Sequence, residues 1–178
     1  MKKLIIITLI LFSFSSVSAQ KKDVFWGVKG GLILPNIIND YLTNSNSIVG
    51  FQLGALVETP ISKKYKIQPE LLVSTHVNKD KFITYLDLPI VFKYHVYKGA
   101  SIEAGPQVGY LLFERNNDNI DNDFKNFDYG LNLGVGHQLK SNYFLQFRYN
   151  LGLSNILGYN GFDNTNAFIQ VSVGYKFN

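Results

Sequence analysis

Hydrophobic and polar residues alternate with a period of two along most of the chain beyond Lys22. This alternation indicates β-strands that have one apolar and one polar face. Eight segments carry the pattern, and we expect strands over residues 24–34, 48–58, 65–75, 82–94, 100–113, 127–138, 143–152 and 167–177. The sequence therefore predicts an all-β protein.

The connections between these segments alternate in length. Long connections rich in Asn, Asp, Ser and Gly cover residues 35–47, 115–126 and 155–166, and a shorter polar one covers 77–81. Tight turns are expected at 59–64, 95–99 and 139–142. Short turns on one rim and long loops on the other are typical of outer-membrane barrels, whose termini lie on the periplasmic side with the short turns.

The composition of the two faces predicts which one meets lipid. Most strand glycines fall on the polar face, where small residues leave room for long polar side chains inside a narrow barrel. The apolar face gathers aromatic residues at the strand ends. The periplasmic rim receives Trp26, Tyr65, Tyr94, Tyr143, Tyr175 and Phe177, and the opposite rim receives Phe127 and Tyr129.

Two aromatic girdles around an aliphatic band match the two interfaces of a membrane. A soluble eight-stranded container would also alternate, but it would turn its apolar face inward. We therefore expect a closed eight-stranded antiparallel up-and-down transmembrane β-barrel with its apolar face toward lipid.

The polar face then collects charges inside the barrel. These are Lys29, Glu58, Glu70, Asp87, Lys93, Glu103, Asp128, Arg148 and Lys176. Buried charges must be paired and hydrogen-bonded, so we expect a luminal polar network. Its predicted members are Lys29, Glu70, Asp87, Lys93, Glu103 and Arg148, with Glu70, Glu103 and Arg148 as the first candidates. About eight strands leave an interior that side chains just fill, which argues against a diffusion pore.

The N-terminus has the order of a secretory signal peptide. Lys2 and Lys3 precede an apolar stretch over residues 4–14, and Val17-Ser18-Ala19 fits the small-residue cleavage rule. We expect a signal peptide over residues 1–19 and one barrel domain over residues 20–178, located in the bacterial outer membrane.

Charge and cysteine content exclude several classes of function. The formal charge of +4 includes Lys2 and Lys3, so the mature chain keeps +2, which is too little for a nucleic-acid-binding surface. The sequence has no Cys, and this excludes disulfides, thiolate metal sites and a cysteine nucleophile.

Several short motifs resemble one protein family. They are Ile67-Gln68-Pro69-Glu70-Leu71-Leu72, Tyr85-Leu86-Asp87-Leu88-Pro89-Ile90, Gly105-Pro106-Gln107-Val108-Gly109 and Val173-Gly174-Tyr175-Lys176-Phe177. Together they resemble the PorT-like family of outer-membrane β-barrel domain proteins across the mature chain. The resemblance implies the barrel fold, and a link to protein secretion for those members that have such a role. The chain departs from the usual barrel ending because Asn178 follows the terminal aromatic residue, Phe177.

Three prolines conflict with a closed barrel. Pro69, Pro89 and Pro106 lie inside expected strands, although proline cannot donate a hydrogen bond to a neighbouring strand. We therefore expect bulges or local breaks in strand pairing near Pro89 and Pro106.

Candidate catalytic and metal-binding residues are few. Ser74 and His76 suggest an alternative function, a small outer-membrane lipid-modifying hydrolase or acyltransferase, but their spacing names no third partner. Carboxylates that could gather a calcium ion are Glu114, Asp118, Asp121 and Asp123, and their spacing is not that of an EF-hand. We expect a protein without enzyme activity, cofactor or metal.

The expected partners follow from the fold. Outer-membrane lipid and lipopolysaccharide surround such a barrel, and the barrel-assembly machinery inserts it. The long outer loops could bind another protein or a surface polysaccharide, because loops on rigid scaffolds often carry function. No nucleic-acid partner is expected.

Overall fold

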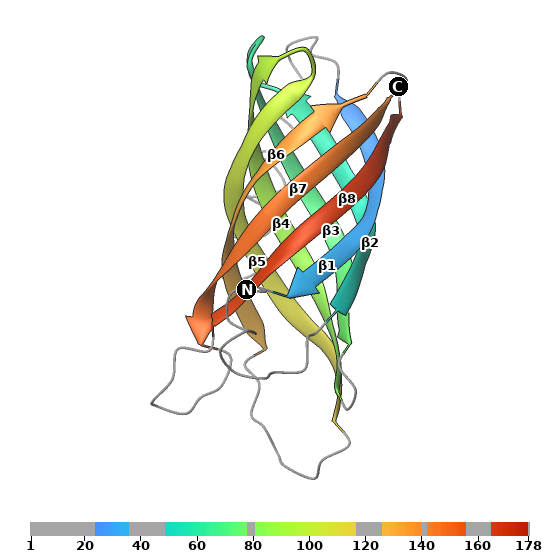
Figure 1. Cartoon of the computed structure of the whole chain (residues 1–178), viewed down its shortest axis with the longest axis vertical. Helices are drawn as coiled ribbons and strands as arrows, with labels where there is room; N and C mark the ends of the chain where they lie inside the picture. The colour runs from blue at the N-terminus through green and yellow to red at the C-terminus, as the bar shows by residue number, and fades with distance from the viewer. Residues whose placement is uncertain are drawn as a thin grey trace, which may run out of the picture.

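A closed barrel of eight strands forms the protein in the computed structural model (Figure 1). The structure describes residues 24–35, 49–77, 81–116, 126–139, 142–155 and 165–177. The strands are β1 (Phe25–Pro35), β2 (Val49–Pro60), β3 (Tyr65–Val77), β4 (Lys81–Tyr97), β5 (Ala100–Asn116), β6 (Phe127–Gln138), β7 (Tyr143–Asn155) and β8 (Thr165–Phe177). The expected signal peptide and most of the long connections lie outside the described residues.

Every strand pairs antiparallel with its neighbour in sequence, and β1 pairs with β8 to close the barrel. The closing pair places Trp26 opposite Phe177. Figure 1 shows the strands steeply tilted, with the C-terminal end of β8 at the top. Such a tilt is what closing a sheet into a barrel requires. The predicted fold class is confirmed. Among the described residues, no helix is long and apolar enough to cross a membrane.

The hairpin of β4 and β5 is longer than predicted. Each strand has 17 residues, and β4 continues through Tyr97 rather than ending at Tyr94. The turn is reduced to Lys98 and Gly99, whose φ angles are 38° and 86°. Positive φ at both central residues is the conformation of a type I′ turn, which matches the twist of paired strands. The predicted turn at 95–99 was therefore too long.

The prolines interrupt hydrogen bonding without shifting the register. Pairing between β3 and β4 joins Pro69 to Ile90 and resumes at Leu72 and Asp87 with the same offset, on either side of Pro89. The register shifts lie elsewhere, between Thr84 and Tyr85, between His95 and Tyr97, and between Leu151 and Asn155. Pairing between β4 and β5 is likewise interrupted between the pairs Pro89–Gln107 and Phe92–Ala104, with the same offset on both sides. The predicted disturbances near Pro89 and Pro106 are therefore confirmed as local breaks without a bulge. Proline removes one N–H donor, yet its fixed φ suits an extended strand, so no extra residue is needed.

The two faces of the barrel wall differ as the alternation predicts. Apolar residues face outward with large exposed fractions, such as Leu53 at 66% and Trp26 at 64%. Charged and amide side chains face inward, and Lys29, Glu103 and Arg148 are each 1% exposed. The predicted orientation, with aliphatic side chains outward and polar groups inside, is confirmed.

Candidate functional site: the charged lumen

A central network of charged residues fills the middle of the lumen, and Arg148 on β7 is its hub. The Arg148 Nη1 and Nη2 atoms donate to both carboxylate oxygens of Glu70 on β3, at 3.0 and 2.7 Å. Its Nε donates to Glu103 Oε2 on β5 at 2.8 Å. One guanidinium therefore ties together two carboxylates from different strands, in the fork geometry for which arginine is suited.

Lys29 and Gln146 complete this central network. Lys29 Nζ lies 2.7 Å from Glu70 Oε2 and donates to Gln146 Oε1 at 3.3 Å. Gln146 in turn donates to both oxygens of Glu103 at 3.1 Å. The network balances two cations against two carboxylates, and each of its polar groups has partners, as burial requires.

A second group, the Glu58 cluster, lies nearer the periplasmic rim and consists of Glu58, Lys66, Lys93 and Lys176. The Glu58 carboxylate accepts from Lys66 at 2.7 Å, from Lys93 at 3.2 Å and from Lys176 at 2.8 Å. Lys93 also lies 3.2 Å from Glu103, so it links the Glu58 cluster to the central network. The lumen is thus held by one continuous set of ion pairs.

The sequence missed the importance of two members of this cluster. Strand alternation placed Glu58 and Lys176 inside the barrel, but the predicted polar network included neither residue. The predicted strand also ended at Glu58. In the structure β2 continues to Pro60, so Glu58 lies within the barrel and is fully buried. Alternation alone could have found their orientation, but not their pairing, because Glu58 and Lys176 come from strands far apart in sequence.

Asp87 is buried in the lumen as expected, but among the described residues no ion pair joins it to the central network or to the Glu58 cluster. Its carboxylate accepts a hydrogen bond from Ser74 instead. Asp87 is paired in register with Gly109, six residues beyond Glu103 on β5, which is about 20 Å along the strand. It lies too far toward the outer rim to reach Arg148.

Amide side chains lie in the lumen between the central network and the level of Asp87. Asn132 donates to Gln107 at 2.9 Å, and Asn150 donates to Asn132 at 3.0 Å. Toward the outer rim the lumen becomes aromatic, since the His76 ring packs against Tyr85 and Phe168 at centroid distances of 6.1 and 5.4 Å. The lumen is therefore stratified from a basic inner end to an aromatic outer end.

Apolar side chains also point into the lumen, although the alternation predicts polar residues on this face. The buried ones are Ile33, Leu56, Leu72, Tyr85, Val91, Phe144 and Phe168. Phe144 has a local role, because Lys93 and Lys176 place their ammonium groups 5.6 and 5.3 Å from its ring centroid. Cation–π contacts of this kind stabilise charges that have left water.

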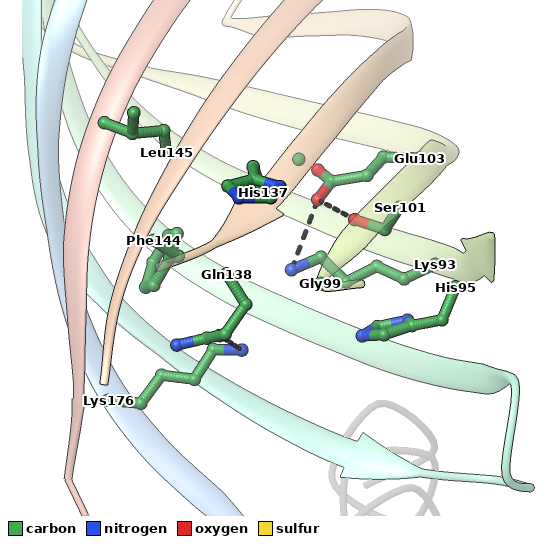
Figure 2. Close-up of a pocket in the computed structure, with 11 residues that line it drawn as sticks. Lys93, His95, Gly99, Ser101, Glu103, His137, Gln138, Phe144, Leu145 and Lys176 are labelled. Carbon is green, nitrogen blue, oxygen red and sulfur yellow. Dashed lines mark hydrogen bonds and ion pairs between the residues drawn. The ribbon is translucent and has the colours of Figure 1, made fainter. Parts of the chain in front are cut away.

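A small pocket opens at the inner end of the lumen (Figure 2). It is partly open to solvent and has room for about one water-sized particle. Lys93, His95, Ser101 and Lys176 contribute polar groups to the wall, and Phe144 contributes an apolar one. Figure 2 shows the Lys93 side chain reaching toward Glu103, to which Ser101 also donates.

The predicted aromatic girdle lies on the outer surface at the rim with the short turns. Tyr65 and Tyr94 have ring centroids 5.1 Å apart, and Tyr175 lies 5.0 Å from Tyr143 and 5.2 Å from Phe177. Trp26, the sixth member, is paired in register with Phe177. Contacts between aromatic rings therefore continue around part of this rim.

The opposite rim has aromatic pairs as well. Phe82 lies 6.3 Å from Phe113, and Tyr110 lies 5.2 Å from Phe127, measured between ring centroids. Their spacing allows edge-to-face packing.

The candidate catalytic pair does not form a hydrogen-bonded triad. Ser74 donates to Asp87, while the His76 ring packs between aromatic rings. Ser74 is also only 1% exposed, so lipid outside the barrel does not reach its hydroxyl. Among the described residues no group of three metal-binding side chains occurs. Asp118, Asp121 and Asp123 lie outside the described residues.

Comparison with known proteins tests the fold and its family. Residues 18–158 match the family described as outer membrane protein beta-barrel domain. The chain belongs to this family. As a member of the outer membrane protein beta-barrel domain family with a closed eight-stranded fold, the protein is an integral barrel of the bacterial outer membrane.

Solved structures with a similar fold include Neisserial surface protein A (NspA). NspA is 11% identical, the match covers 89% of this chain and 100% of that chain, and the TM-score is 0.52. The N-terminal β-barrel domain of Pseudomonas aeruginosa OprF is 12% identical, with 89% and 100% coverage and a TM-score of 0.46. A de novo designed transmembrane β-barrel is 14% identical, with 89% and 98% coverage and a TM-score of 0.47. The likeness to NspA supports the fold. No curated protein matches the chain.

Proposed function

We propose that this member of the family is a non-conducting, non-enzymatic membrane anchor that presents its long outer loops to a binding partner. The observation that carries the proposal is the Arg148 bridge to Glu70 and Glu103, which places ion pairs across the middle of the lumen. In the described part of the barrel, these ion pairs lie across the middle of the lumen and obstruct a continuous water path for solutes. Function then rests on the surfaces at the two rims.

The proposal extends to partners at each surface. Outer-membrane lipid and lipopolysaccharide contact the apolar face, and the barrel-assembly machinery inserts the chain. A protein partner binds the outer loops, whose sequences at 36–48, 117–125 and 156–164 are long and polar. The PorT-like motifs, such as the one that contains Pro69 and Glu70, support a role for this partner in protein secretion.

Two measurements test this function separately. Purified protein in a planar lipid bilayer should give no stepwise conductance at neutral pH, and regular open-channel steps would contradict the plugged lumen. In cells, replacing residues 156–164 with a short Gly-Ser linker should reproduce the secretion defect of a deletion strain. The control variant is Lys98→Asn in the inner turn, which gives an Asn-Gly turn sequence and should complement the deletion. Full complementation by the loop variant would refute binding through that loop.

A further inference from the structure

The inner end of the lumen carries more positive than negative charge within the described chain. Three ammonium groups, those of Lys66, Lys93 and Lys176, converge on the single carboxylate of Glu58. The central network does not correct this excess, because Glu70 and Glu103 are already matched by Lys29 and Arg148. The Glu58 cluster therefore has a net charge of +2.

The acidic residues of the outer lumen are too distant to neutralise this cluster. Asp87 and Asp128 both pair in register with Gly109 on β5, whereas Lys93 pairs with Glu103. Six residues along a strand separate the two levels by about 20 Å. The layer that contains Gln107 and Asn132 lies between them.

This excess charge is held largely out of water. The side chains of Lys93 and Lys176 are only 4% and 7% exposed, while Lys66 is 23% exposed. Burying an uncompensated charge is unfavourable, so a counter-ion that can enter the site is strongly favoured.

A site for such an ion lies directly beside the two buried lysines. The inner pocket is lined by Lys93, Lys176, His95 and Ser101 among others, and it has room for about one water-sized particle (Figure 2). The Nδ1 atom of His95 is buried and has no hydrogen-bond partner. An imidazole nitrogen without a partner can donate to an anion when it carries the proton.

We propose that this pocket is a binding site for a small inorganic anion, such as chloride, that enters from the periplasm. The anion compensates the Glu58 cluster and accepts a hydrogen bond from His95. The pocket has room for about one water-sized particle, which a monoatomic anion fits better than a larger organic one. Bound anion then stabilises the inner end of the barrel, because it binds the folded state only.

The test compares anions of different size at the same ionic strength. Refolded protein in detergent micelles is titrated with sodium chloride or bromide against sodium gluconate, and the midpoint of thermal unfolding is recorded. A saturating rise in the midpoint with chloride and bromide, absent with gluconate, is the expected result. Identical curves for all three salts would mean general screening and would overturn the site.

Two variants change the charge of the cluster in opposite directions. Glu58→Gln raises the net charge and should lower the half-saturating chloride concentration, whereas Lys176→Gln lowers the charge and should raise it. Each shift should be about tenfold, corresponding to one unit charge at close range in a partly buried site. The matched control is Ser172→Ala, which removes the hydrogen-bond acceptor of Gln52 elsewhere in the lumen. It should leave the half-saturating chloride concentration unchanged.

Opposite shifts in the half-saturating chloride concentration distinguish binding from a structural effect, because simple destabilisation would shift this concentration in the same direction in both variants. Shifts in the same direction would therefore overturn the proposal. Chlorine-35 NMR line broadening on the wild-type protein keeps the test independent of variant folding. Bromide should reduce the broadening by displacing chloride, and a chloride line that is no broader with the protein than without it would refute the site.

Discussion

The Arg148 guanidinium crosses the lumen from β7 to the Glu70 carboxylate on β3, with nitrogen–oxygen distances of 3.0 and 2.7 Å. These strands are four apart in a ring of eight, so the bridge spans the barrel from one wall to the other. Neighbouring strands are joined by backbone hydrogen bonds, but only side chains join opposite walls. The bridge therefore fixes the cross-section of the barrel as well as neutralising two buried charges.

Removing the bridge should be costly. Arg148→Met leaves Glu70 and Glu103 buried without their main cation, and we expect a loss of about 3–5 kcal/mol in the free energy of unfolding. Urea unfolding of protein refolded into lipid vesicles measures this loss. Phe147→Leu, at the adjacent lipid-facing position, should change stability by less than about 1.5 kcal/mol. A loss from Arg148→Met no larger than that control would contradict the importance of the bridge.

The cost should fall when the charges are removed together. The double variant Glu70→Gln and Arg148→Met removes one carboxylate together with the cation, so the central network keeps one cation, Lys29, and one carboxylate, Glu103. Its stability should recover by about 1–4 kcal/mol relative to Arg148→Met, because the remaining cation and carboxylate balance each other. The same urea series measures the recovery, and an additive loss would show that the two side chains act independently.

Two glycines on opposite faces of the wall should respond differently to a methyl group. A Cβ at Gly54 would overlap the backbone of β3 at Leu71 and Leu72, which cannot move without disturbing the strand pair. Gly54→Ala should cost about 1–3 kcal/mol. At Gly30 the nearest atoms are 3.5 Å or more away, so Gly30→Ala should be close to neutral. Equal effects, compared by the midpoint of urea unfolding, would argue against close packing at Gly54.

A charge on the lipid-facing surface should be tolerated at the rim and not at the middle. Leu53 is paired in register with Gly30 near the level of Lys29, so Leu53→Arg should cost about 2–4 kcal/mol. Tyr97 precedes the inner turn, and Tyr97→Arg should cost about 0–1 kcal/mol. Unfolding from vesicles measures both variants. If the two costs were equal, the apolar band would not lie across the hydrocarbon core as assigned.

The inner hairpin turn should depend on Gly99. Its φ of 86° is unfavourable for residues with a side chain, and an added Cβ would come within 2.7 Å of the Gln138 carbonyl oxygen. Gly99→Ala should therefore lower stability by about 1–2 kcal/mol. Lys63→Ala in the exposed turn between β2 and β3 is the control, and it should have little effect on the thermal midpoint. A neutral Gly99→Ala would indicate that the turn adopts another conformation.

Period-two alternation was sufficient to predict which face each strand buries. It predicted that Lys29, Glu103 and Arg148 point inward, because this orientation depends only on odd or even position along a strand. The same signal continues through His95 and Val96, so part of the greater length of β4 was present in the sequence although the predicted strand stopped at Tyr94. Tyr97 lies beyond a register shift and breaks the alternation.

The level of a residue along the barrel axis was not predictable in the same way. Asp87 points inward as expected, but its distance from Arg148 depends on how β4, β5, β6 and β7 are staggered. That stagger arises from pairings such as Lys93 with Glu103, which no local pattern specifies. The convergence of three lysines on Glu58 has the same origin, since it joins residues from β2, β3, β4 and β8.

The pairing of Trp26 with Phe177 joins the first described strand to the last. Until β8 pairs with β1 the sheet has two open edges, whose backbone N–H and C=O groups find no hydrogen-bond partner in hydrocarbon. Insertion must therefore wait for the complete chain, or be shielded by another protein until the seam closes. A nonsense mutation anywhere before β8 should leave a product that is degraded rather than a smaller working barrel.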